Sequence, residues 1–285
     1  MSRSNERSRF AIKHITGFVY DGLAESSYNE ARMTPLASPR QRVLETTLRI
    51  RPAASQLTYL DYFGTVVTSF DLHEPHDQLE VTAEAIVEIS PTGRSHALLG
   101  RTALDNRGLR DQMAEYLAPT RRTTLPRELH SQFASERLSD DCDEVVAEVS
   151  RYVRDHVAYV TGSTHVQTTA YESWTQRTGV CQDLSHVTIA LVRGLGIPAR
   201  YVSGYLHPVS DAAIGQTVQG QSHAWVEYFA GEWVGVDPTS GGDIGLSHVA
   251  VARGRDYSDV PPLKGIYHGA PSWALGVTVE MTQLD

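Results

Sequence analysis

The chain has 285 residues, enough for one large or two ordinary domains with a sizeable core. Its 41% hydrophobic and 21% charged residues indicate a folded globular protein rather than a disordered one. Its net charge of −9 argues against a general nucleic-acid binder, which would need a basic face.

The polar N-terminus lacks the apolar core of a signal peptide, and no apolar run is long enough to span a bilayer. We therefore expect a cytoplasmic protein without a membrane partner. Cys142 and Cys181 are the two cysteines, too few for a disulfide framework, so we expect both to be free thiols.

Residues 9–90 are predicted to form β-strands. Apolar and polar residues partly alternate in segments 10–15, 43–50 and 79–89, and turn-forming residues separate these segments. Several short strands at this spacing predict an antiparallel β-sandwich over residues 1–95.

After about residue 96 the periodicity becomes helical. We place a helical connection at 96–135 and a core with a C-terminal strand at 136–285. Asp140 and Asp141 are predicted to cap a long helix, whose apolar stripe comprises Val145, Val146, Val149, Tyr152, Val153 and Val157.

The clearest helix of the chain follows Gly179 and ends near Gly196 and Pro198. Its predicted buried face comprises Leu184, Val187, Leu191 and Leu195. Cys181 therefore lies in the first turn. There the helix dipole and unpaired N–H groups favour a thiolate and could stabilise an oxyanion.

Position alone does not assign a function to Cys181, because a free cysteine at a helix start is often a small buried side chain. Cys142 offers a comparison, since it also lies near a predicted helix start. Asp140, Asp141 and Asp143 flank it, and their charges would raise its pKa and disfavour the thiolate. We interpret Cys142 as structural or incidental.

Residues 222–236 predict a β-hairpin that turns near Ala230. An odd-length loop centred on Ala230 would place His223 and Asp237 directly opposite each other on one face. The carboxylate could then hold the imidazole in one tautomer. Taken alone, His223 is more often a half-buried strand histidine and Asp237 a turn cap before Pro238. The predicted cross-strand register of the two residues is what favours a functional role for the pair.

Zinc bound by Cys181, His223 and Asp237 is a chemical alternative. The predicted cross-strand pairing favours a hydrogen bond between the histidine and the aspartate over shared coordination. Thiol chemistry needs no metal or organic cofactor, so we expect none.

Other candidates have a weaker basis. Gln182 could donate a hydrogen bond to a substrate or lie on the surface. Trp174 and Trp225 could line a substrate groove, although core packing is commoner for a single tryptophan. Asp183 and His186 are interpreted as structural or polar support within the same helix.

Around these residues the sequence resembles the transglutaminase-like superfamily, whose members share a papain-like arrangement of Cys, His and Asp. The resemblance is carried by segments 179–186, 196–205, 223–227 and 233–239. Segments 27–35, 61–64 and 254–260 resemble a bacterial branch that carries a β-domain before this core. Members of that branch are often described as transglutaminase-like cysteine proteases.

The resemblance implies an α+β fold: an N-terminal antiparallel β-sandwich, then a papain-like core in which the helix bearing the cysteine packs on an antiparallel sheet bearing the histidine and the aspartate. It implies that Cys181 is the nucleophile, His223 the general base and acid, and Asp237 its orienting group. The family's oxyanion-hole tryptophan cannot be aligned with Trp174, so the backbone N–H of Cys181 is the first candidate donor.

We expect a cysteine-dependent hydrolase that cleaves a peptide or amide bond of a peptide or protein substrate through a thioacyl-enzyme. Acyl transfer to an amine, as in transglutaminases, is the first alternative. A non-catalytic binding module on the same fold is the second. The sequence makes no prediction of the oligomeric state.

Overall fold

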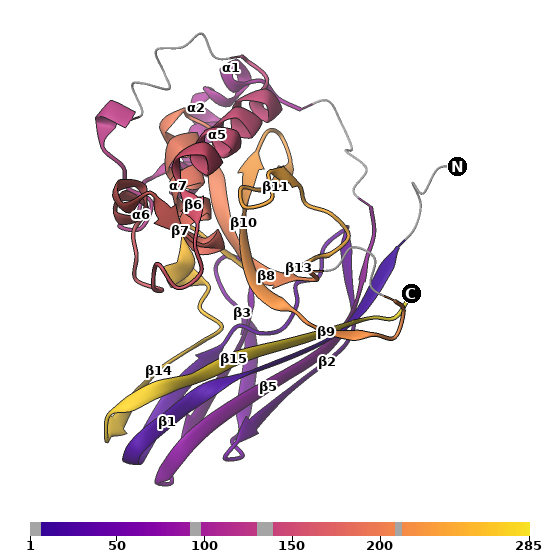
Figure 1. The fold of residues 1–285 in the computed structure, drawn as a ribbon, viewed down its shortest axis with the longest axis vertical. Coiled ribbons are helices and arrows are strands. Elements are labelled where there is room, and N and C mark those ends of the chain that lie inside the picture. The colour runs from indigo at the N-terminus through magenta and orange to yellow at the C-terminus, as the bar shows by residue number, and fades with distance from the viewer. Residues whose placement is uncertain (1–6, 92–97, 130–138, 209–212) are drawn as a thin grey trace.

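The computed structural model describes residues 7–91, 98–129, 139–208 and 213–285. Within these ranges the chain forms an eight-stranded sheet, a five-stranded sheet covered by helices, and a short parallel pair (Figure 1). The α+β class predicted from the sequence is confirmed. No helix in the described ranges is long and apolar enough to cross a membrane.

The larger sheet is antiparallel and curls around its longest strand. Its strands are β1 (Ser8–Ala31), β2 (Gln41–Arg51), β3 (Gln56–Leu60), β4 (Val66–Leu72), β5 (His76–Ile89), β9 (Thr217–Gln219), β14 (Leu263–Gly269) and β15 (Ser272–Gln283). The first half of β1 lies between β5 and β15, and its second half lies between β4 and β14. Because one strand joins both halves, the expected sandwich is a single curled sheet.

Strands from both ends of the described chain build this sheet. Figure 1 shows β14 and β15, in yellow, beside the indigo β1, and their antiparallel registers with β1 are continuous apart from bulges. The boundaries near residues 95 and 135 remain predictions of the sequence. Sheet membership does not follow them, because strand pairing is non-local and alternation within β15 does not reveal its partner.

The smaller sheet has the order β12-β11-β10-β8-β13. Its strands are β8 (Ala199–Leu206), β10 (Gln221–Phe229), β11 (Trp233–Asp237), β12 (Gly242–Asp243) and β13 (His248–Gly254). The longer helices beside it are α5 (Cys142–His156), α6 (Ala170–Gln176) and α7 (Cys181–Gly194). The short elements are α1 (Arg101–Leu104), α2 (Arg107–Gln112), α3 (Ala114–Leu117), the 3-10 helix η1 (Tyr257–Asp259), and the parallel pair β6 (Ala158–Tyr159) and β7 (Thr178–Gly179).

The helix cores agree with the predicted apolar stripes. The valines predicted for α5 are buried, and they pack with the predicted face of α7 against β10 and β11. Asp141 caps α5 by accepting the N–H groups of Asp143 and Glu144. Gly196, with φ of 82°, follows the end of α7 in the left-handed conformation that glycine adopts most readily.

A second apolar cluster joins the two sheets. Phe10 and Ile12 of β1 pack with Tyr205 of β8 and with Val249 and Val251 of β13. Each of these side chains is at most 5% exposed. The eight-stranded sheet therefore supports the five-stranded sheet through a shared core rather than through a linker alone.

Candidate active site

Cys181 is the first residue of α7, and its side chain is half-buried. Asp183 fixes the turn that precedes it: one carboxylate oxygen accepts the N–H of Val180 at 2.9 Å and the hydroxyl of Thr164 at 2.6 Å. Gly179 has no room for a side chain, because a Cβ there would lie 2.7 Å from Asp183 Cβ. Asp183 thus acts as the structural support expected of it.

His223 and Asp237 form a buried hydrogen bond of 3.0 Å between Nε2 and Oδ2. The Cys181 side chain is the other hydrogen-bonding partner of His223. Burial opposes the charged imidazole, but the hydrogen bonds to Asp237 and Cys181 outweigh it and raise the pKa of His223 to about 9. The structure therefore brings the three residues singled out in the sequence together.

The predicted hairpin exists, but its predicted register is wrong. Strand β10 pairs Phe229 with Trp233 and Val226 with Val236, so the loop is centred on Gly231 rather than on Ala230. Gly231 has φ of 91°, which favours it over a side-chain-bearing residue at the centre of the turn. Continued along the strands, this register places His223 diagonally from Asp237 rather than directly opposite, still on the same face.

Asp237 accepts hydrogen bonds on both carboxylate oxygens. Oδ1 accepts the N–H of Thr239 at 2.8 Å, and Oδ2 also accepts the hydroxyl of Ser240 at 2.9 Å. Burial alone would raise the pKa of Asp237, but the hydrogen bonds from His223 and His248 hold it well below its usual range. Asp237 therefore remains a carboxylate next to His223.

The sequence did not single out His248, which the structure brings to the same carboxylate. Its Nε2 lies 3.5 Å from Asp237 Oδ2, and the side chain is buried. The one feature of the sequence that draws attention to His248 is its position at the start of an apolar segment. That position does not predict Asp237 as its hydrogen-bonding partner.

His223, Asp237 and His248 could in principle hold a metal, because their ligand atoms all lie within 4.8 Å of one another. The hydrogen bonds argue against such a site. The Gly245 N–H points at His248 Nδ1 at 3.3 Å, so a neutral His248 ring carries its proton on Nε2, the atom that faces Asp237. A protonated nitrogen has no lone pair for a metal, so these residues fit a hydrogen-bonded relay better.

The residues predicted to support the substrate lie in three different settings. Trp225 is 2% exposed, with its ring centroid 6.2 Å from that of His223. Trp174 stacks on Tyr152 of α5 at 5.6 Å, a packing contact. The amide of Gln182 donates to the carbonyl of His165 at 3.5 Å. A substrate contact by any of them stays a prediction.

Tyr159 is a further residue at the site that the sequence did not reveal. It lies on β6 and pairs with Gly179, two residues before Cys181. Its side chain is 50% exposed. Partial burial and the charges of Cys181 and Asp237 raise the pKa of Tyr159, which places the phenol beside the site and open to solvent.

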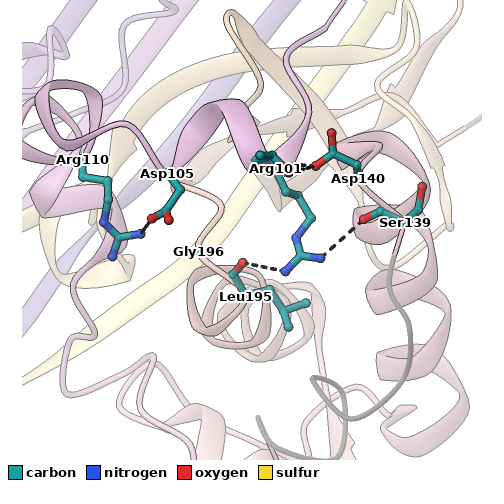
Figure 2. Close-up of a pocket in the computed structure, with 8 residues that line it drawn as sticks. Arg101, Asp105, Arg110, Ser139, Asp140, Leu195 and Gly196 are labelled. Atoms are coloured by element: carbon teal, nitrogen blue, oxygen red, sulfur yellow. Dashed lines mark hydrogen bonds and ion pairs between the residues drawn. The ribbon is translucent and has the colours of Figure 1, made fainter.

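The pocket drawn in Figure 2 lies at the other end of α7. It is lined by Arg101, Thr102, Asp105, Arg110, Ser139, Asp140, Leu195 and Gly196. A helix of 14 residues is about 21 Å long, which separates this pocket from Cys181. Arg101 donates to the carbonyls of Leu195 at 3.3 Å and Ser139 at 3.4 Å, so it stabilises the negative end of α7.

Two family models match the chain. The bacterial transglutaminase-like N-terminal region matches residues 10–88, and the transglutaminase-like superfamily core matches residues 129–238. An uncharacterised protein of Mycobacterium leprae is 40% identical over 97% of this chain and 99% of its own length. The chain belongs to the transglutaminase-like superfamily.

Two further proteins are similar to this transglutaminase-like protein, one in fold and one over part of the sequence. The crystal structure of a candidate cysteine protease from Cytophaga hutchinsonii has a TM-score of 0.77 at 22% identity, over 98% of this chain and 92% of that one, which shows a shared fold. A protein-glutamine gamma-glutamyltransferase of Pseudomonas aeruginosa is 30% identical over 42% of this chain and 20% of its own length.

Proposed function

We propose that this transglutaminase-like protein is a cysteine-dependent hydrolase of peptide or amide bonds. Cys181 would be its nucleophile, His223 its general base and acid, and Asp237 the group that orients His223. The observation that carries the proposal is the position of His223 between the Asp237 carboxylate at 3.0 Å and the Cys181 side chain. This is the geometry that an activated thiol requires.

In the first half of the proposed reaction, the Cys181 thiolate attacks the carbonyl carbon of the substrate. The N–H of Cys181 is the first candidate donor to the resulting oxyanion, and the hydroxyl of the half-exposed residue Tyr159 is the second. As the C–N bond breaks, protonated His223 gives its proton to the leaving amine. The pKa of about 9 supports this role, because it keeps the ring protonated at neutral pH.

In the second half, His223 is neutral and takes a proton from water. The resulting hydroxide attacks the thioacyl carbon, the C–S bond breaks, and the acid leaves as Cys181 returns to the thiolate. Throughout, the Asp237 carboxylate holds the proton of His223 on Nε2, which leaves Nδ1 for the exchange with Cys181 and water.

Acyl transfer to an amine is the second candidate function. It is favoured by the partial similarity to the Pseudomonas aeruginosa gamma-glutamyltransferase. Hydrolysis is preferred because water needs no dedicated second site. The substrate class is a peptide or a protein that presents an amide, and a cytoplasmic location remains a prediction.

The proposal is tested on a library of peptides and isopeptides, incubated with and without a primary amine, with Cys181→Ser as the matched control. Hydrolysis predicts a free acid by mass spectrometry in the presence or absence of the amine, and none from the variant. An amine adduct with no acid would replace hydrolysis by transfer. Binding without turnover, equal in both proteins, would indicate a binding module.

A further inference from the structure

We propose that His248 is a positioning residue for the catalytic machinery: its Nε2–H holds the Asp237 carboxylate in the orientation that His223 needs. The relay would then run from His248 through Asp237 and His223 to Cys181. This inference rests on the proposed function, since it assigns His248 a part in activating the same thiol.

The hydrogen-bonding partners of His248 indicate which of its two ring nitrogens carries the proton. The Gly245 N–H lies 3.3 Å from Nδ1, so Nδ1 of the neutral ring is the acceptor and Nε2 carries the proton. Nε2 in turn lies 3.5 Å from Asp237 Oδ2. Both side chains are buried, and a buried N–H that faces a buried carboxylate oxygen satisfies the hydrogen-bonding needs of both groups.

His248 and Asp237 belong to strands that are not neighbours in the five-stranded sheet. His248 starts the edge strand β13, whereas Asp237 ends β11, and strands β8 and β10 lie between them. Gly204 of β8 leaves room for the Trp225 ring, because a Cβ there would lie 2.1 Å from the Val249 carbonyl oxygen and 2.6 Å from that ring. The Trp225 ring in turn packs edge-on against His248, with centroids 5.4 Å apart.

The hydrogen bond has a specific consequence for His223. Both imidazoles use the same oxygen of Asp237, so His248 holds that oxygen on the side of His223. Without this donor the carboxylate can turn away, the charged form of His223 is less stabilised, and less Cys181 thiolate is available at neutral pH. His248 does not itself contact the reacting atoms in this scheme, so its loss should lower kcat and leave KM unchanged.

Two substitutions separate the hydrogen bond from the space that the ring fills. His248→Phe keeps a planar ring but removes the donor, whereas His248→Gln keeps an N–H donor at about the position of Nε2. His14→Phe is the control for loss of a buried histidine, because His14 is 1% exposed and hydrogen-bonds Tyr205 at 2.9 Å. If His248→Phe does not fold, His248→Asn takes its place, since its shorter amide cannot reach Asp237.

The measurement is the rate of Cys181 alkylation by iodoacetamide over a pH series, followed by mass spectrometry on the folded proteins. We expect His248→Phe to slow alkylation about tenfold at neutral pH and to move its midpoint to higher pH, the size expected from losing one hydrogen bond to a charged group. His248→Gln should stay within about threefold of the wild type. His14→Phe should match the wild type.

The two proposals fail in different ways. If wild-type Cys181 reacts no faster than Cys142, the proposed function itself fails. If wild-type Cys181 reacts fast but His248→Phe is equally fast, or if its midpoint moves to lower pH, only the positioning role is overturned. Equal slowing by the phenylalanine and glutamine variants would also overturn it, because the donor would then not be the cause.

Discussion

Cys142 and Cys181 each begin a helix, yet their surroundings differ in charge. Cys142 begins α5, where burial and the charges of Asp140 and Asp141 raise the pKa of its thiol to about 11. Cys181 begins α7, where its side-chain partner is His223. A helix N-terminus alone therefore does not favour the thiolate of Cys142.

This contrast predicts the reactivity of the two thiols. At neutral pH, iodoacetamide should modify Cys181 at least about tenfold faster than Cys142, because the thiolate is the reactive form. Peptide mapping after short exposures measures both rates in one sample. His223→Ala should slow the alkylation of Cys181 and leave that of the buried Cys142 unchanged, which separates thiolate formation from the difference in burial. Equal rates in the wild type would contradict an activated Cys181.

The Asp237 carboxylate should set the acidity of His223. In Asp237→Asn the amide keeps the size of the side chain but removes the charge, so the pKa of His223 should fall below about 9. Turnover should drop about 10²-fold or more, as expected when the imidazole is no longer held in one tautomer. NMR titration of the imidazole gives the pKa, and an unchanged value would contradict the assigned pairing.

The raised pKa of His223 also makes stability depend on pH. Because the folded pKa of about 9 exceeds the ordinary value of 6.5, the stabilisation is complete below pH 6.5 and is lost as the pH rises through about 9. The Tm of the wild type should therefore fall over this range, and that of His223→Gln should fall less. Parallel curves for the two proteins would show that the histidine does not cause the loss.

At the scale of the elements, the turn before α7 depends on Gly179. A Cβ at this position would lie 2.7 Å from both Ser173 Oγ and Asp183 Cβ. Gly179→Ala should therefore cost about 1–3 kcal/mol in the free energy of unfolding and displace the start of α7. Urea denaturation measures the cost. Gly276→Ala is the matched control, because a Cβ there meets nothing within 4 Å.

The sequence predicted helices better than strand pairings. The valine stripe and the aspartate cap of α5, and the leucine face of α7, are local signals with helical spacing, and all are present in the structure. The β10–β11 hairpin was predicted in the right place but with the wrong turn centre. A one-residue shift of the turn centre moves every cross-strand partner by two positions, so His223 and Asp237 kept their common face.

The contact between His248 and Asp237 is a part of the site that could not be predicted from the sequence. Asp237 lies across two intervening strands of the five-stranded sheet from His248, and the Trp225 ring that packs against His248 occupies the space left by Gly204. Neither fact is encoded in the residues next to His248. A hydrogen bond between edge and interior of a sheet becomes visible only when the strand order is known.

At the scale of the whole molecule, the shared apolar cluster should make the two sheets unfold together. Met281 of β15 is fully buried in that cluster, with Phe10 of β1 and Val251 of β13. Met281→Ala should cost about 2–5 kcal/mol and lower a single thermal transition of the whole chain. Calorimetry and intrinsic fluorescence should give the same Tm. Two separate thermal transitions, only one of which is shifted by Met281→Ala, would contradict the expectation that the two sheets unfold together.

The sequence predicted a two-part organisation from the change of periodicity near residue 96, and that division stays a prediction. What the sequence did not show is that β14 and β15 return to the first sheet. Apolar alternation in β15 marks Val279 and Met281 as buried but is equally compatible with either sheet. Sheet membership is set by packing between segments far apart in the chain.

The long strand β1 has a consequence for how the protein is made. One edge of β1 is covered by β5 and β4, which follow soon after it, while the other edge is covered by β14 and β15. During translation that second edge stays unpaired until the entire helical region and the strands β14 and β15 have emerged from the ribosome. An open strand edge attracts other chains. The nascent protein is therefore expected to need chaperone protection until its last strands arrive.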